Sequence, residues 1–161
     1  MSSLKRASDP ARAGADRYVR SGVRSTRELR AYLAARRVGS EAAERLIREY
    51  ERSGALDDRA CARLWAEQWA RRQYAWNTIR ERLITKGLPT DAIESAAQSV
   101  GHPAAERSRA RALVARAARG GGRLAWSRLA RTLASRGFDP ELIDEVLRNA
   151  LGPDPDPDAE R

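Results

Sequence analysis

Apolar residues recur along the chain with the spacing of a helix surface. Ala43, Leu46, Ile47 and Tyr50 follow the order i, i+3, i+4 and i+7, which is the apolar stripe of an amphipathic α-helix. Alanine, leucine and arginine are abundant, whereas β-branched and aromatic residues are scarce, a composition that favours helix. We therefore predict an all-α fold.

The helical pattern repeats every 50 residues. Residues 26–50, 76–100 and 126–150 align without a gap, and each contains two apolar stripes separated by a short break. The equivalent apolar positions include Leu29, Ile79 and Leu129, then Leu33, Leu83 and Leu133, then Val38, Leu88 and Phe138. One hairpin cannot bury its own stripe, so such repeats stack on one another. The pattern predicts an elongated, curved body, right-handed or crescent-like.

Residues typical of turns and caps separate the two helices of each hairpin. Gly87 and Gly137 suit the left-handed residue that ends a helix. Pro140 suits the first position of the next helix, and the run Ser25-Thr26-Arg27-Glu28 has the pattern of a capping box. The expected N-caps of the second helices are Ser40, Thr90 and Asp139.

A third helix is expected after each of the first two hairpins. One should start at Asp57 or Asp58 and run to about Arg72, and another should run from Pro103 to about Arg119. The first should turn Cys61, Leu64, Trp65 and Trp69 inward. Eight main helices result, with a short extra helix at 15–19. We expect a mobile segment at 1–14, repeat 1 at 15–72, repeat 2 at 73–122, a truncated repeat 3 at 123–151, and a disordered acidic tail at 152–161.

The net charge of +9 is unevenly distributed. Residues 1–24 carry six basic and two acidic side chains, a surplus of four, and residues 103–123 carry six basic side chains and Glu106, a surplus of five. On a helical wheel the arginines of the second stretch form one broad arc opposite Ala110, Leu113, Val114 and Ala117. Guanidinium groups match phosphate and carboxylate oxygens, so this arc could bind DNA or an acidic protein. The alternatives are an arginine-rich proteome and a merely solvated helix face.

No constellation of residues typical of an enzyme is present. The sequence lacks a phosphate loop, a dinucleotide-binding glycine motif and a nucleophilic serine elbow. His102 is expected in a turn, Cys61 in the core, and Asp57 and Asp58 at a helix start. Trp76 and Trp126 occupy equivalent repeat positions, which favours a place in the core over base stacking. We expect no enzymatic activity and no cofactor.

The location of the protein also follows from its composition. A single cysteine and a single histidine argue against a disulfide and a zinc site. The chain has no stretch of about 20 apolar residues that could cross a membrane. We expect a cytoplasmic protein.

Three blocks of the sequence resemble the ordered signature blocks of the RecX family. They are Ser25 to Leu29, Gly54 to Ala62, and Ile79 to Leu88. Two departures fall at packing and turn positions: Cys61 replaces a common aromatic residue, and Ala75-Trp76 replaces a glycine. The resemblance covers about residues 15–151. It implies a non-enzymatic, crescent-like regulator that binds RecA filaments in their groove and inhibits strand exchange and the coupled ATP hydrolysis.

Two hypotheses for function therefore stand beside each other. The first is a monomeric regulator of RecA–DNA filaments, with non-specific contacts to single- or double-stranded DNA. The alternative is a general helical DNA-binding or architectural protein without RecA contact. The candidate filament- or DNA-binding residues are Arg107, Arg109, Arg111, Arg116, Arg119, Arg123, Arg71, Arg72, Arg80, Arg82 and Lys86.

Overall fold

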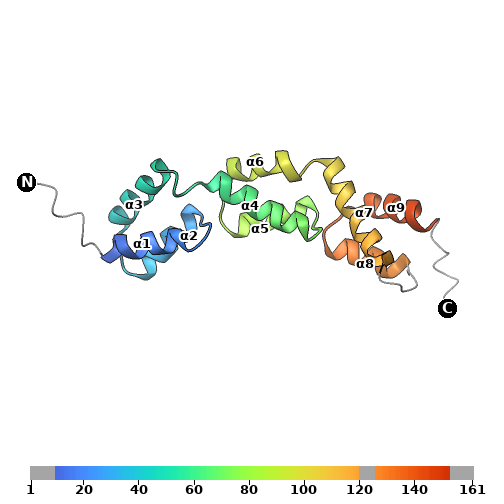
Figure 1. The fold of residues 1–161 in the computed structure, drawn as a ribbon, viewed down its shortest axis with the longest axis horizontal. Helices are drawn as coiled ribbons and strands as arrows, with labels where there is room; N and C mark the ends of the chain where they lie inside the picture. Colours follow the sequence, from blue (N-terminus) through green and yellow to red (C-terminus); the bar gives the residue numbers. More distant parts are fainter. Residues whose placement is uncertain (1–9, 120–125, 153–161) are drawn as a thin grey trace, which may run out of the picture.

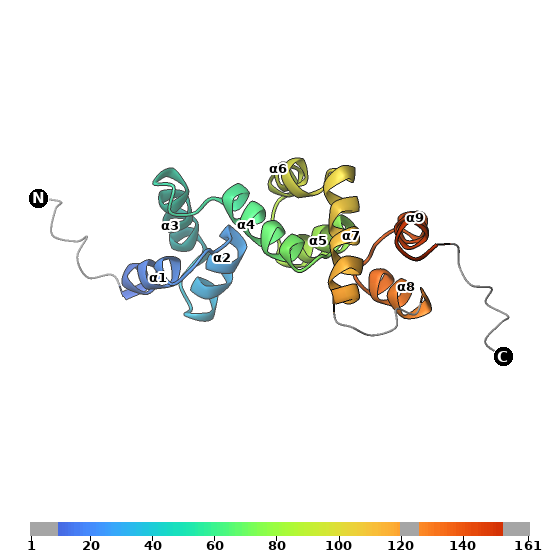
Figure 2. The same ribbon diagram turned by 45° about the vertical axis from the view of Figure 1, so that its right-hand side comes forward.

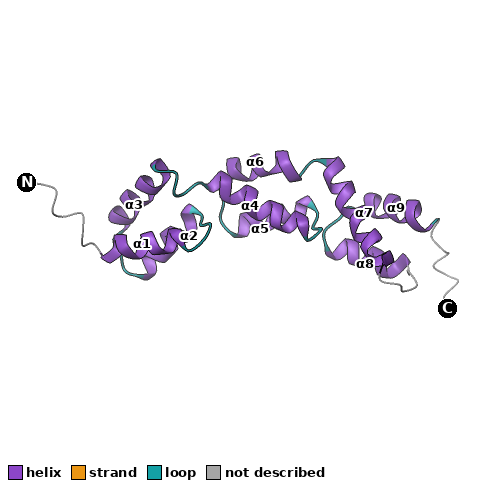
Figure 3. Ribbon diagram, in the orientation of Figure 1, coloured by secondary structure: helices purple, strands orange, loops and turns teal. Residues whose placement is uncertain are grey.

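The structure is a computed structural model that describes residues 10–119 and 126–152. Within these ranges the chain forms nine α-helices and no strand (Figure 3), which confirms the all-α prediction. The helices are α1 (Pro10–Arg20), α2 (Thr26–Ala35), α3 (Ser40–Arg52), α4 (Asp58–Arg71), α5 (Trp76–Thr85), α6 (Thr90–Val100), α7 (Pro103–Arg119), α8 (Trp126–Ser135) and α9 (Pro140–Leu151).

The helices form a row of three-helix units. In Figure 1, α1 to α3 occupy one end, α4 to α6 the middle, and α7 to α9 the other end. The same order appears after a 45° turn in Figure 2, so the row is not an effect of one viewing direction. The elongated body and the tandem three-helix repeats are therefore confirmed.

Each unit has its own hydrophobic core within the described residues. Leu29, Leu33 and Ile47 are buried between α1, α2 and α3. The middle core contains Cys61, Trp69 and Ile79 from α4 and α5, and also residues of α6. The last core contains Leu113, Leu133 and Leu147 from α7, α8 and α9.

These cores correct the expected repeat boundaries. We expected the third helix to belong with the hairpin before it, but α4 and α7 share a core with the hairpin that follows them. The boundaries 15–72, 73–122 and 123–151 are therefore out of phase with the packing, and the last unit is complete because α7 belongs to it. Linear order cannot decide this point, since the stripe of α4 could be buried against either neighbouring hairpin.

The two ends also differ from the expectation. Helix α1 begins at Pro10, so residues 10–14 of the segment expected to be mobile are helical. Residues 1–9 lie outside the described residues, as do 153–161 of the expected acidic tail and the glycines at 120–122.

Helix starts are only partly as expected. Ser25 accepts a hydrogen bond from the Glu28 amide and Glu28 accepts one from the Ser25 amide, so the capping box is confirmed. Asp139 caps α9 as expected. Ser40 and Thr90 are instead the first helical residues, and the cap positions before them have no side-chain hydrogen bond.

Adjacent units are joined by a hydrogen bond that occurs twice. Asp58 in the first turn of α4 accepts from the Thr26 amide at 2.8 Å. Glu106 in the first turn of α7 accepts from the Trp76 amide at 3.0 Å. Thr26 and Trp76 begin α2 and α5, where amides have no partner inside the helix. Helices α4 and α7 thus each cap a helix of the preceding unit.

Two glycines, Gly87 and Gly137, lie close against the preceding unit. Gly87 and Gly137 have φ of +74° and +83°, as expected for residues that end helices. A Cβ at Gly137 would lie 2.0 Å from Thr78 Oγ1 in the preceding unit, and one at Gly87 would lie 1.9 Å from Arg27 Cδ. The equivalent residue of the first unit is Arg37. It also has a positive φ of 58°, but no preceding unit lies against it within the described chain.

Candidate binding surface

Helix α7 carries five of the eleven candidate residues and buries its opposite side. Ala110, Leu113 and Val114 are buried in the core of the last unit. The arginines spread over the rest of the helix circumference, but they have three different environments. Arg123 lies outside the described residues.

Arg109 is a structural residue. Its Nε donates to the Tyr74 carbonyl at 3.0 Å and its Nη1 donates to the Val100 carbonyl at 2.8 Å. Both acceptors belong to the preceding unit. Burial lowers the pKa of the Arg109 guanidinium. The prediction that Arg109 forms part of an exposed basic arc is therefore wrong, because its stem lies at the edge of the packed face.

Arg107 and Arg111 lie beside α9. Arg107 Nε is 2.9 Å from a Glu145 carboxylate oxygen, and Arg111 Nη2 is 3.6 Å from the same oxygen. Their charge is partly balanced by this shared carboxylate. They are available to a ligand only in competition with Glu145.

Arg116 and Arg119 are two further exposed cations of α7. Neither has an ion-pair partner among the described residues. Two other candidates, Arg72 and Arg80, share this condition, whereas Arg71 lies 3.8 Å from Glu67. These four unpaired arginines are the candidates best placed to meet an external anion.

A second group of candidates lies against aromatic rings of the middle unit. Lys86 Nζ lies 3.2 Å from Glu28 Oε1 and 4.0 Å from the centre of the Trp65 ring. The Arg82 guanidinium lies 4.1 Å from the centre of the Tyr74 ring and donates to its hydroxyl, which lowers the pKa of that group. These cations join α5 to its neighbours and already have partners.

Arg136 belongs to the same group and was not among the candidates. Its guanidinium lies 4.7 Å from the Tyr74 ring centre and donates to the Arg72 carbonyl. Arg136 follows Lys86 by one 50-residue period, and that register could have identified it. Both residues follow the first helix of a hairpin and contact the preceding unit.

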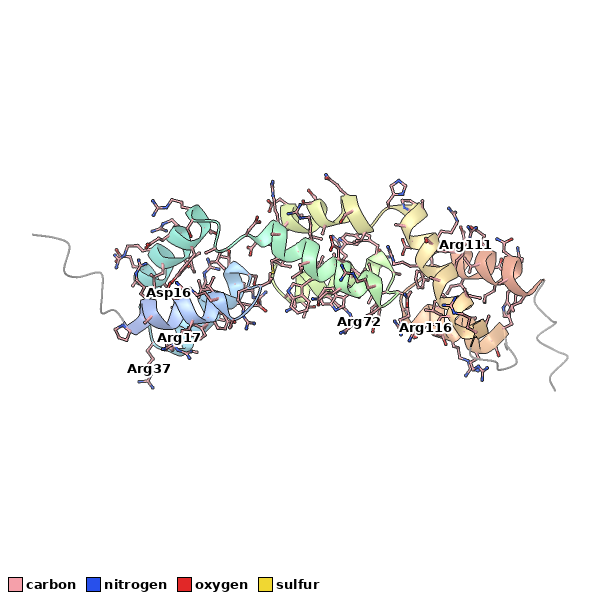
Figure 4. All side chains as sticks on the ribbon, in the orientation of Figure 1. Asp16, Arg17, Arg37, Arg72, Arg111 and Arg116 are labelled. Atoms are coloured by element: carbon pink, nitrogen blue, oxygen red, sulfur yellow. The ribbon has the colours of Figure 1, made fainter. Side chains whose placement is uncertain are left out.

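Exposed arginines from all three units lie along one side of the body. In Figure 4, Arg17, Arg37, Arg72 and Arg116 lie along its lower side, whereas Arg111 lies higher, beside α9. We call these four residues the basic edge. The candidates did not include Arg17 and Arg37. The charge surplus of residues 1–24 pointed to Arg17, but no sequence signal placed Arg37 on the same side.

Groups with possible chemical reactivity are accounted for by the fold. Cys61 is 1% exposed, and burial raises the pKa of its thiol to about 11. His102 Nδ1 accepts from the Ala104 amide at the start of α7. Leu64, expected to face inward, is 40% exposed, because α4 packs through Cys61 and two alanines on a narrower face.

Two further findings concern the described parts of the chain. No cluster of histidine, cysteine and acidic side chains there could hold a metal ion. None of the helices in those parts is both long and apolar enough to cross a bilayer.

Sequence comparison relates the chain to named regulatory proteins. It is 33% identical over 148 residues to the regulatory protein RecX of Streptomyces coelicolor, an alignment that covers 89% of this chain and 78% of the relative. The regulatory protein RecX of Thermus thermophilus is 44% identical over 66 residues, or 41% of this chain and 45% of the relative. No family model matches the chain.

Solved structures share the fold. The crystal structure of RecX from Lactobacillus salivarius superposes with a TM-score of 0.73 at 15% identity, covering 86% of this chain and 93% of that one. A second crystal structure of a regulatory protein RecX gives a TM-score of 0.68 at 16% identity, covering 84% and 69%. The row of three-helix units is therefore also found in experimental structures.

Proposed function

The chain belongs to the RecX family of non-enzymatic RecA regulators, and from this premise we propose that its body lies along a RecA–DNA filament and inhibits the recombinase. The observation that supports this proposal is the basic edge. Arg17 and Arg37 come from the first unit, Arg72 follows α4, and Arg116 comes from α7 (Figure 4). A long row of units with exposed cations in each unit suits an extended, negatively charged partner better than a small ligand.

The proposed contact includes the phosphates of the DNA. Exposed guanidinium groups without internal partners can neutralise phosphates and release counterions, which gives sequence-independent binding that weakens with salt. Arg72, Arg116 and Arg119 are exposed and unpaired within the described chain. We assign them the main DNA-facing role and place the activity in the cytoplasm, where RecA acts.

The test follows RecA activity directly. Purified protein is added to RecA on single-stranded DNA while ATP hydrolysis and strand exchange are measured. We expect both to fall as the protein is added. Unchanged rates at a saturating concentration would contradict inhibition. Binding to bare DNA is measured in parallel, because a general DNA-binding protein would bind RecA filaments no better than naked DNA.

A charge-matched pair of variants tests the assigned surface. We expect the triple variant Arg72→Gln, Arg116→Gln and Arg119→Gln to bind filaments more weakly, with a salt slope lower by about 0.7 for each lost phosphate contact. The control variant Arg45→Gln, Arg48→Gln and Arg52→Gln removes the same charge from α3, which lies across the first unit from α2 in Figure 1. If both variants weaken filament binding equally, the effect is one of bulk charge, and Arg72, Arg116 and Arg119 have no specific role.

A further inference from the structure

A groove opens between the C-terminal halves of α7 and α9. Its volume is about 320 Å³. Ala115 and Ala118 line it from α7, and Asn149 and Ala150 line it from α9, with Arg111 also in the wall. The groove is therefore mainly apolar and has a cation beside it.

The last unit differs from the middle one in the residues buried beside this groove. Helices α4 and α6 pack closely, through Ala66 and Ala96, which are both 0% exposed. Val146 follows Ala96 by one 50-residue period, and Val114 follows Glu106 by eight residues, as Ala66 follows Asp58. Both valines are buried in the core of the last unit, where α7 and α9 contact each other less than α4 and α6 do. Larger side chains at a helix contact favour a wider spacing of the helices, and the groove lies beside these two valines.

The chain's own acidic C-terminal segment begins at this groove. Helix α9 ends at Leu151, directly after the groove residues Asn149 and Ala150. The next nine residues, Pro153-Asp154-Pro155-Asp156-Pro157-Asp158-Ala159-Glu160-Arg161, carry four carboxylates and three prolines. At about 3.3 Å per residue, they can reach up to about 30 Å, which is more than the C-terminal half of α7 needs at about 1.5 Å per residue.

Charge complementarity identifies the occupant. Arg111 lines the groove, and Arg119 is exposed in the last turn of α7, next to the groove residue Ala118 in the sequence. The apolar proline rings suit the alanine walls. The aspartates between them add negative charge for Arg119 and for Arg111, whose charge Glu145, at 3.6 Å, balances only in part. A neutral or basic segment would match only the apolar walls of the groove and not its arginines.

We propose that residues 153–161 bind in the groove between α7 and α9, with their carboxylates beside Arg111 and Arg119, and compete with external polyanions for α7. The contact between the tail and the groove is internal to this chain and does not depend on RecA. Its effect on filament binding rests on the function proposed above.

The contact is tested by disulfide formation without RecA or DNA. In a Cys61→Ala background, Ala159→Cys keeps all four carboxylates of the tail. It is paired with Ala118→Cys in the groove or with Ala112→Cys, an exposed residue of the same helix outside the groove lining. We expect the Ala118 pair to oxidise at least about fivefold faster, because the bound tail raises the local thiol concentration.

Salt provides the second readout. At about 1 M salt the Debye length falls to about 3 Å, so the advantage of the Ala118 pair should shrink. Equal rates for the two pairs at low salt would overturn the proposal. An advantage that does not change with salt would overturn the role of the carboxylates.

Competition is tested with a single-stranded oligonucleotide. The tail variant Asp154→Asn, Asp156→Asn, Asp158→Asn and Glu160→Gln is compared with Glu41→Gln, Glu81→Gln, Glu94→Gln and Glu141→Gln, which removes the same number of negative charges elsewhere. We expect the tail variant to bind severalfold more tightly than this control. Equal affinities would overturn the competition, and this result does not depend on whether RecA is inhibited.

Discussion

Arg109 and Arg116 lie on the same helix and differ in what surrounds their guanidinium groups. Arg109 reaches two carbonyls of the preceding unit, whereas Arg116 is exposed without an ion-pair partner in the described chain. A half-buried cation that donates to carbonyls fixes an interface, because removing it leaves those acceptors unsatisfied. An exposed cation contributes little to stability and remains free to bind an anion.

This contrast gives a prediction for stability. Arg109→Ala should lower the free energy of unfolding by about 2–4 kcal/mol, since two carbonyls lose their donor and the side chain leaves a gap. Arg116→Ala should change it by no more than about 0.5 kcal/mol. Urea unfolding followed by circular dichroism measures both. Similar values for the two variants would argue against a structural role for Arg109.

Cys61 offers a prediction about pH. Burial, and then the charge of Glu28, raise the pKa of its thiol from 9.0 to about 11. The folded state therefore holds the thiol proton more strongly than the unfolded state does. The resulting stabilisation is complete below the ordinary pKa and is lost as the pH rises through the raised value.

The measurement compares wild type with Cys61→Ala. The difference in their free energies of unfolding should narrow as the pH rises from about 9 to about 11, whereas it should stay constant between pH 6 and 8. The variant is the control, because it keeps every tyrosine and lysine that titrates in the same range. A constant difference up to pH 11 would contradict the burial effect.

At the scale of the elements, the start of α4 has two functions. Asp57 caps α4 itself by accepting from the Ala60 amide at 3.0 Å, while the adjacent Asp58 accepts from the first amide of α2. Two neighbouring carboxylates thus serve different helices in different units. Glu106 repeats the second role for α5, so the connection belongs to the repeat.

The two aspartates can be separated experimentally. Asp58→Ala should speed hydrogen exchange at the Thr26 amide, and Asp57→Ala should speed it at the Ala60 amide, with about 1 kcal/mol lost from stability in each case. Amide exchange measured by NMR distinguishes the two sites. If Asp58→Ala leaves Thr26 protected, α4 does not cap the preceding unit in solution.

At the scale of the whole molecule, separate cores and repeated junctions produce a row. Each unit buries its own apolar residues. Adjacent units contact each other through a helix cap, a glycine and a basic side chain, which is Lys86 on Glu28 at the first junction and Arg136 on the Tyr74 ring at the second. These junctions are small and polar compared with the cores. The body therefore stays extended, and its exposed arginines are spread along its length (Figure 4).

Small-angle X-ray scattering checks this shape. A compact domain of 161 residues would have a radius of gyration of about 15 Å. We expect a clearly larger value that does not change with protein concentration, because the chain buries its own cores and is proposed to be a monomer. A value near that of a compact globule would contradict the elongated arrangement. A value that grows with concentration would contradict the monomer.

The sequence alone determined the helices and the period of the fold. Apolar spacing identifies the buried side of a helix because residues three and four apart share one face, so the pattern correctly placed Leu29, Ile79 and Leu129 in three equivalent cores. Turn chemistry identified Gly87 and Gly137 because few other residues adopt a positive φ without strain. Helix periodicity and turn conformation depend on residues close together in the sequence, so the sequence is enough to predict them.

Only the tertiary structure decided which elements meet. The stripe of α4 was known, but its packing against the following hairpin depended on the fit of side chains from residues far along the chain. Arg109 and Arg116 were equivalent as basic residues of one helix until the carbonyls of Tyr74 and Val100 enclosed the first of them. The distance between units sets the burial and the partners of each charge, and a one-dimensional pattern does not contain that distance.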